Sequence, residues 1–242
     1  MDRLLGAMEV AALLHGLSVV ALPILVAITF HEAAHGLVAY RLGDPTAKYL
    51  GRLTLNPLAH IDPFGTIALP LLLYVTPWLL GGQPGVVFGY AKPVPVNFMN
   101  LRRPKADMIW VAAAGPLTNF ALAVVSGVLL KMLTGLSGFG GVSEPLVGGR
   151  PLAVMILEPL GQMLQYSVLI NVILMVFNLL PIPPLDGGRV LVGVLPSAAA
   201  DRLAAVEPYG MFIVLALVFL DPLRLVFRII APITATLIHL IL

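Results

Sequence analysis

The sequence contains no cysteine and few charged residues for its length. Without cysteine, a disulfide framework, a cysteine-ligated zinc ion and a thiol nucleophile are excluded. Charged residues make up 11% of the 242 residues and hydrophobic residues 59%, against about 25% and about 45–50% in soluble domains. A soluble fold of this size cannot bury so much apolar surface. The composition therefore indicates an integral membrane protein and excludes a cytosolic enzyme, a nucleic-acid-binding protein and a disordered chain.

The sequence contains several long apolar segments. Residues 16–40, 106–131 and 151–181 each exceed the roughly 20 apolar residues that a spanning helix needs. The 63–80 segment, with Pro70 and Pro77 in its interior, is marginal. These lengths predict an all-α polytopic membrane protein, with residues 1–242 forming one domain around a core of three helices.

The C-terminal segments at 208–242 and two of the loops allow further expectations. Asp221 and Pro222 interrupt the C-terminal apolar stretch, so a hairpin of two helices and one kinked helix both fit it. Residues 46–56 and 85–97 are rich in β-branched and aromatic residues and are bounded by turn-forming residues. We expect these two loops to form a small β-element at the membrane surface.

The strongest chemical signal is His31-Glu32-Ala33-Ala34-His35, which lies inside the first apolar segment. Positions i and i+4 of a helix lie on one face, so both imidazoles can reach one zinc ion. Glu32 beside them could take a proton from water at the metal. The alternative is polar residues that join helices by hydrogen bonds, but three such groups within five residues of a membrane segment favour a functional site.

A catalytic zinc site needs a third protein ligand. The candidate is Asp186, which follows Pro181, Pro183 and Pro184 and precedes two glycines. The prolines end the fourth apolar segment and the glycines permit a tight turn, so the carboxylate could point back into the bundle. The alternative is an aspartate that caps a short helix at residues 189–195.

Together these motifs resemble the site-2 protease family of intramembrane zinc metalloproteases. The resemblance rests on HEAAH, on Gly115-Pro-Leu-Thr-Asn119 and on Asn178-Leu-Leu-Pro-Ile-Pro-Pro-Leu-Asp186-Gly-Gly-Arg, in that order. The stretches 51–66 and 88–97 further resemble the compact prokaryotic branch without PDZ or CBS domains. The resemblance implies hydrolysis of transmembrane protein substrates in regulated intramembrane proteolysis. It also implies one zinc ion per chain, held by His31, His35 and Asp186, with Glu32 as the base.

Asn119 and Asn178 are further candidates for the catalytic site. Either side-chain amide could donate a hydrogen bond to the oxyanion of the scissile carbonyl or hold an extended substrate. The alternative for each is an ordinary hydrogen bond between membrane helices. By contrast, we expect His60 and Asp62 to have a structural role, such as capping the helix that starts near Pro63.

The distribution of lysine and arginine predicts the topology. The loops 41–62 and 81–105 carry seven cations, whereas the 132–150 loop carries Arg150 alone. Because cytoplasmic loops are enriched in these residues, we expect both cation-rich loops on the cytoplasmic side. The 63–80 segment would then enter the membrane and return. HEAAH would lie close to the cytoplasmic boundary of a multi-pass protein in a prokaryotic plasma membrane, in contact with the lipid bilayer.

A transporter and a catalytically silent scaffold are the two alternatives to a protease. A proton or metal-ion transporter would place ionisable residues along several spans, but here they concentrate at one depth. A catalytically silent membrane scaffold would more naturally have lost Glu32 or a ligand, and all of them are present. The sequence therefore favours a zinc-dependent intramembrane endopeptidase.

Overall fold

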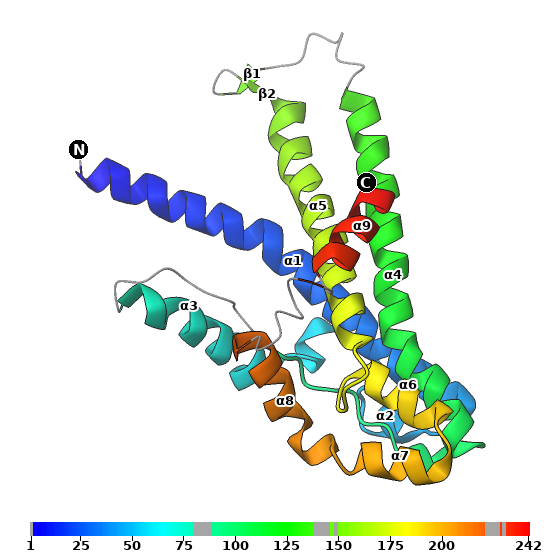
Figure 1. Ribbon diagram of the computed structural model, residues 1–242. Coiled ribbons are helices and arrows are strands. Elements are labelled where there is room, and N and C mark those ends of the chain that lie inside the picture. Colours follow the sequence, from blue (N-terminus) through cyan, green and yellow to red (C-terminus); the bar gives the residue numbers. More distant parts are fainter. Residues whose placement is uncertain (1, 80–88, 138–145, 148–149, 221–227, 229–230) are drawn as a thin grey trace.

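The structure is a computed structural model that describes residues 2–79, 89–137, 146–147, 150–220, 228 and 231–242. Most of the described chain is helical (Figure 1). The α-helices are α1 (Asp2–Leu42), α2 (Thr46–Tyr49), α3 (Leu69–Leu79), α4 (Pro104–Ser137), α5 (Leu152–Asn178), α6 (Asp186–Val194), α7 (Ser197–Ala204), α8 (Glu207–Leu220) and α9 (Ala231–Ile241). Short 3₁₀ turns occupy Pro57–Ala59 and Phe98–Asn100, and a π-helical turn at Pro63–Ala68 leads into α3. The strands β1 (Leu146–Val147) and β2 (Arg150–Pro151) form a two-residue antiparallel ladder.

Three helices, α1, α4 and α5, pack against one another and form the core of the molecule (Figure 1). Among the described residues, three stretches are long and apolar enough to cross a membrane, namely Ser18–Leu42, Pro104–Gly135 and Ile156–Asn178. They match the three predicted spans, so the all-α polytopic membrane fold and its three-helix core are confirmed.

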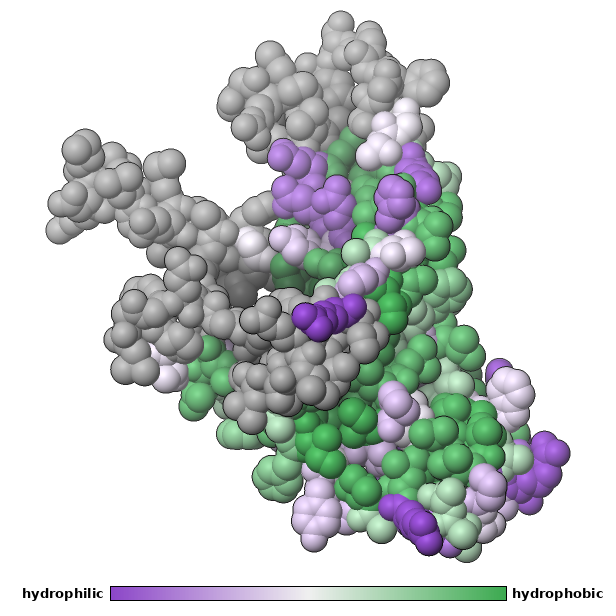
Figure 2. Space-filling view, viewed as in Figure 1, coloured by the Kyte–Doolittle hydropathy of each residue, from purple (hydrophilic) through white to green (hydrophobic). Residues whose placement is uncertain are grey.

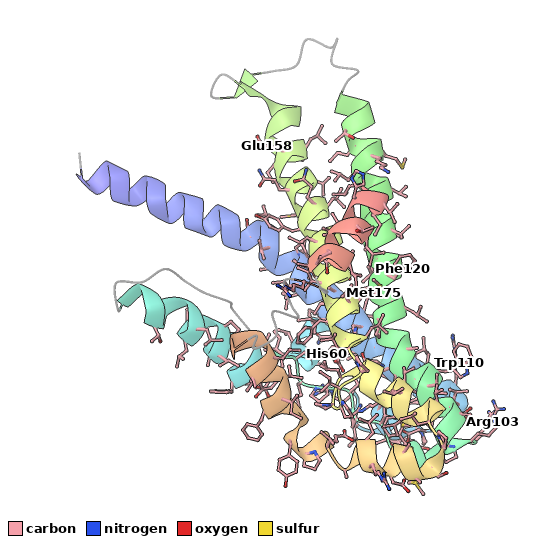
Figure 3. The ribbon with its side chains drawn as sticks, viewed as in Figure 1. His60, Arg103, Trp110, Phe120, Glu158 and Met175 are labelled. Carbon is pink, nitrogen blue, oxygen red and sulfur yellow. The ribbon has the colours of Figure 1, made fainter. Side chains whose placement is uncertain are left out.

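The bundle is tightly packed inside and apolar outside. Ala123 of α4 meets Val168 and Val172 of α5, and all three side chains are fully buried. On the outside, apolar side chains such as Trp110 and Val125 are more than half exposed. Figure 2 shows apolar residues along the α4 flank and hydrophilic residues at the end near α7, and Figure 3 shows Trp110 pointing outward. Such an exterior suits contact with lipid.

The two cation-rich loops lie on the same face of the bundle. The N–H of Arg102 donates to the carbonyl of Leu42 at 3.0 Å, and the N–H of Tyr90 donates to Gly65 at the same distance. The chain that leaves this face at residues 63–65 is therefore back beside its starting point at residue 90. α3 continues the π-helical turn, and the described part of this segment ends with it at Leu79.

The described part of the C-terminal apolar stretch holds two helices, α8 with 14 residues and α9 with 11. Figure 1 shows them apart, with α9 lying against α5 and α4. The Asp221-Pro222 interruption lies outside the described residues.

The expected β-element is wrong for the described parts of both loops. Residues 46–49 form α2, and residues 89–97 have no strand partner. Two backbone donors that a partner strand could have used bind side chains instead: Asp44 accepts from Asn97 at 2.7 Å and Glu32 accepts from Val94 at 2.7 Å. The β1–β2 ladder belongs instead to the connection between α4 and α5.

Candidate metal centre

α1 presents His31 and His35 one turn apart on the face that packs against α4 and α5. Their Nε2 atoms are 3.1 Å apart. His31 is buried and His35 is partly buried, so neither imidazole is free to turn into bulk solvent. The four-residue spacing therefore directs two nitrogen ligands toward one point inside the bundle.

Asp186 reaches the same point from the other end of the chain. It is the first residue of α6, and its Oδ2 lies 3.2 Å from Nε2 of His31 and 3.4 Å from Nε2 of His35. The capping alternative does not apply, because the start of α6 has no side-chain cap. Gly187 makes this turn possible, since an added Cβ would lie 2.2 Å from the carbonyl oxygen of Leu179.

The three candidate ligand atoms have the spacing of a zinc site. Bonds of about 2.0–2.1 Å in a tetrahedron place ligand atoms roughly 3.3 Å apart, and the observed separations are 3.1, 3.2 and 3.4 Å. The buried Oδ2 of Asp186 also has no hydrogen-bond partner in the structure, as expected of an atom reserved for a metal. The donor set, two imidazoles and a carboxylate, is one that zinc takes.

Contacts to the other ring nitrogen fix the tautomer of both histidines. The Nδ1–H of His31 donates to Oδ1 of Asn119 at 2.5 Å, and the Nδ1–H of His35 donates to the carbonyl of Val111 at 2.7 Å. Both acceptors lie on α4. With Nδ1 protonated, each Nε2 has its lone pair free for a metal.

Asn119 is held in turn by a residue that the sequence reasoning missed. Its Nδ2 donates to Oδ1 of Asn171 on α5 at 2.8 Å, and Nδ2 of Asn171 donates to the carbonyl of Ser167 at 2.8 Å. Both asparagines are fully buried. Asn171 did carry a signal, because it is an amide side chain within an apolar span, seven residues before Asn178 and on nearly the same helix face.

Gly115 of α4 lies directly against the imidazoles of His31 and His35. An added Cβ would lie 2.5 Å from Cε1 of His31 and 2.5 Å from Nε2 of His35. Any larger side chain would therefore occupy the space between the imidazoles.

Glu32 and Asn178 both line a cavity of about 1010 Å³ that opens beside the ligand atoms. Most of its wall is apolar and comes from α1, α4, α5, α8, α9 and residues 89–98. Oε2 of Glu32 accepts a hydrogen bond from the N–H of Val94 at 2.7 Å. Asn178 uses its Nδ2 to donate to the carbonyl of Leu174 at 2.9 Å. Asn119, in contrast, is not part of the cavity wall.

His60 and Asp62 have the structural roles expected of them. The buried His60 donates from Nε2 to the carbonyl of Thr54 at 2.9 Å. Asp62 accepts from the N–H groups of Phe64 and Gly65 and caps the turn that leads into α3. Figure 3 shows His60 below α5, among the loops and not on α1.

Comparison with known proteins agrees with this geometry. A model of peptidase family M50 matches residues 19–220. A Bacillus subtilis protein named "Putative zinc metalloprotease YwhC" is 36% identical over 200 residues, which cover 83% of this chain and 79% of that protein. The Rip2 protein of Mycolicibacterium smegmatis, named in the same way, is 31% identical over 83% of this chain and 66% of its own length. No solved structure matches the chain.

Proposed function

The chain belongs to peptidase family M50 and is a membrane zinc metalloprotease, and from that premise we propose that it cleaves peptide bonds within transmembrane segments of other proteins. One observation supports this most directly. The candidate ligand atoms and the cavity lie among α1, α4 and α5, the helices long enough to cross a membrane. A substrate that reaches this cavity would do so from the lipid or from the membrane surface.

The proposal assigns a role to each site residue. His31, His35 and Asp186 hold the zinc ion, and Glu32 is the general base. A bound zinc ion polarises the scissile carbonyl and makes water easier to deprotonate. Glu32 takes the proton as the water oxygen forms its bond to the carbonyl carbon, and gives it to the leaving nitrogen as the C–N bond breaks. Residues 1–242 then act as a single catalytic domain.

The two asparagines take different roles in this proposal. Asn178 lines the cavity, so its amide is available to substrate or to the developing oxyanion. Asn119 is bonded to His31 and Asn171, and its contribution is to hold His31 in the tautomer that binds metal.

A transmembrane substrate has to unwind locally before it is cut. Within a helix each carbonyl is bonded to an N–H four residues away, which shields the peptide bond. The apolar wall of the cavity suits the side chains of such a segment. We further propose regulated intramembrane proteolysis in a prokaryotic plasma membrane, with the site toward the cytoplasm, because the cation-rich loops adjoin the end of α1 that follows HEAAH.

The transporter alternative predicts a path of ionisable residues through the bundle. In the described spans, the acidic, basic and histidine side chains lie at His31, Glu32 and His35 or nearer the same end of the bundle, whereas Lys131 and Glu158 lie toward the opposite ends of α4 and α5. Between these two levels α4 and α5 carry no acidic, basic or histidine residue. This pattern favours a single site over a pathway.

Replacement of Glu32 by Gln tests the proposal. The amide keeps the shape of the side chain but cannot take a proton, so Glu32→Gln should keep its zinc and lose about 10²–10⁴-fold in cleavage rate. The assay is cleavage of a membrane-spanning model peptide by detergent-purified protein, with zinc measured by elemental analysis and a chelator as control. Wild-type cleavage by Glu32→Gln would exclude Glu32 as the base. A zinc-loaded wild type that cleaves nothing in a broad substrate panel would favour the scaffold.

A further inference from the structure

Residues 90–97 form an extended segment whose alternate N–H groups point into the protein. Tyr90 donates to Gly65 at 3.0 Å and Lys92 donates to His60 at 2.9 Å. Two residues further on, Val94 donates to Oε2 of Glu32 at 2.7 Å. A spacing of two residues is typical of an extended chain. The third N–H of the series, that of Val94, donates to the candidate base.

The side chain of Val94 locks the segment against α1 at this point. Val94 is 7% exposed. It packs over Gly36, where an added Cβ would lie 3.0 Å from its Cγ1. Because Gly36 is one turn beyond Glu32, the small residue lets the backbone of Val94 approach the carboxylate closely.

The donor at Val94 has no substitute nearby. In the described part of the chain it provides the hydrogen bond that Glu32 receives. The neighbours on both sides are Pro93 and Pro95, which have no N–H. Arg52 helps to hold the segment in place by donating to the carbonyls of Lys92 at 2.8 Å and Pro93 at 3.3 Å.

We propose that the backbone N–H of Val94 positions Glu32 for proton transfer, an inference that rests on the proposed protease function. A hydrogen bond from a neutral N–H to a carboxylate is among the stronger ones in proteins. It holds Oε2 and leaves Oε1 to meet the attacking water. Residues 90–97 are then part of the catalytic geometry, and Val94 acts through Glu32 without touching the reacting atoms.

The expected effect is a loss in kcat and not in metal binding. A carboxylate displaced by about 1 Å costs roughly 10²-fold in rate. Zinc content should stay as in the wild type, because the change leaves the three ligands and the hydrogen bonds that orient His31 and His35 in place. KM should change little, because the change removes one backbone donor from the base and leaves the apolar wall in place.

Two variants remove the N–H of Val94. Val94→Pro does so genetically, and residue 94 already precedes Pro95, so its backbone is confined to the extended region that proline accepts. Replacement of Val94 by α-hydroxyisovaleric acid exchanges the N–H for an ester oxygen and keeps the side chain. This ester carries the test if Val94→Pro does not fold. Val94→Ala is the matched comparison, since it trims the side chain and keeps the donor.

The measurements are kcat and KM for a membrane-spanning model peptide, together with zinc content. A loss of about 10²-fold in kcat for the ester, with zinc and KM within threefold of wild type and a smaller loss in Val94→Ala, supports the inference. A wild-type kcat in the ester overturns it. An equal loss of kcat in Val94→Ala would also overturn it, because the effect would then come from the side chain. A change in KM or zinc content alone, with a wild-type kcat, would overturn it as well. A wild type that cleaves no peptide would refute the protease function as well.

Discussion

Individual residues determine which atoms face the candidate zinc site. His31 and His35 each use Nδ1 to donate to α4, and both Nε2 atoms therefore point toward Oδ2 of Asp186. The two histidines come from one helix, but Asp186 comes from a turn about 150 residues later. Its removal would leave two ligands on an ion that requires more.

Asp186→Ala should therefore lose zinc. Two imidazoles cannot complete a tetrahedral site, and we expect zinc affinity to fall by at least about 10²-fold. Elemental analysis after dialysis against a weak chelator measures the occupancy. Asn178→Ala is the control, because a neutral amide is a poor zinc ligand and this variant should keep its metal. Full occupancy in Asp186→Ala would remove Asp186 from the ligand set.

At the scale of elements, Asp44 joins the loop after α1 to the loop before α4. Its buried carboxylate accepts hydrogen bonds from the side chain and N–H of Thr46, from the N–H of Asn97 and from Nδ2 of Asn100. Burial raises the pKa of this carboxyl, but the hydrogen bonds, led by that of the Thr46 hydroxyl, outweigh it and lower the pKa below the ordinary value. The same contacts fix residues 90–97 near the metal centre.

The lowered pKa of Asp44 predicts a pH-dependent contribution to stability. A carboxyl with a lower pKa in the folded state stabilises it fully above the unfolded pKa of about 3.9, and this contribution is lost as pH falls through the folded pKa. Asp44→Asn should cost about 2 kcal/mol at pH 7, and the difference from wild type should shrink below about pH 4. Thermal unfolding in detergent between pH 7 and pH 3 measures it. A difference that is constant with pH would contradict the role of the charge.

At the scale of the whole molecule, the described parts of both cation-rich loops gather at one end of the bundle, while the β1–β2 ladder lies at the other (Figure 1). Lysine and arginine follow the same division. A bilayer that covers the apolar flank would therefore separate the two ends, with the metal centre nearer the cation-rich one.

Single cysteines test this arrangement, because the native chain has no competing thiol. Tyr49 and Met99 are both 81% exposed, so Tyr49→Cys and Met99→Cys should fold normally and react with a membrane-impermeant maleimide from the same side. Gly135→Cys, at the far end of α4, has open space at its Cβ and should react from the opposite side. Labelling of positions 49 and 99 from opposite faces would mean that residues 63–80 span the membrane.

Local patterns in the sequence were enough to predict the three spans, the pairing of His31 with His35 and the structural roles of His60 and Asp62. These features depend on helix periodicity, apolar length and capping, all of which act within a few residues. Asp186 was also predicted, because its proline- and glycine-rich surroundings dictate a turn at the end of a span. The resemblance to site-2 proteases pointed to the same residue.

The remaining features depend on packing between segments far apart in the sequence. Residues 46–56 and 85–97 looked like strands, yet Asp44 and Glu32 take the backbone donors that a sheet would need. The bonds from His31 to Asn119, from Asn119 to Asn171 and from Val94 to Glu32 join positions 88, 52 and 62 residues apart. No local propensity encodes such partners. They form because folding brings these distant segments together, and polar groups buried between them are paired with one another there.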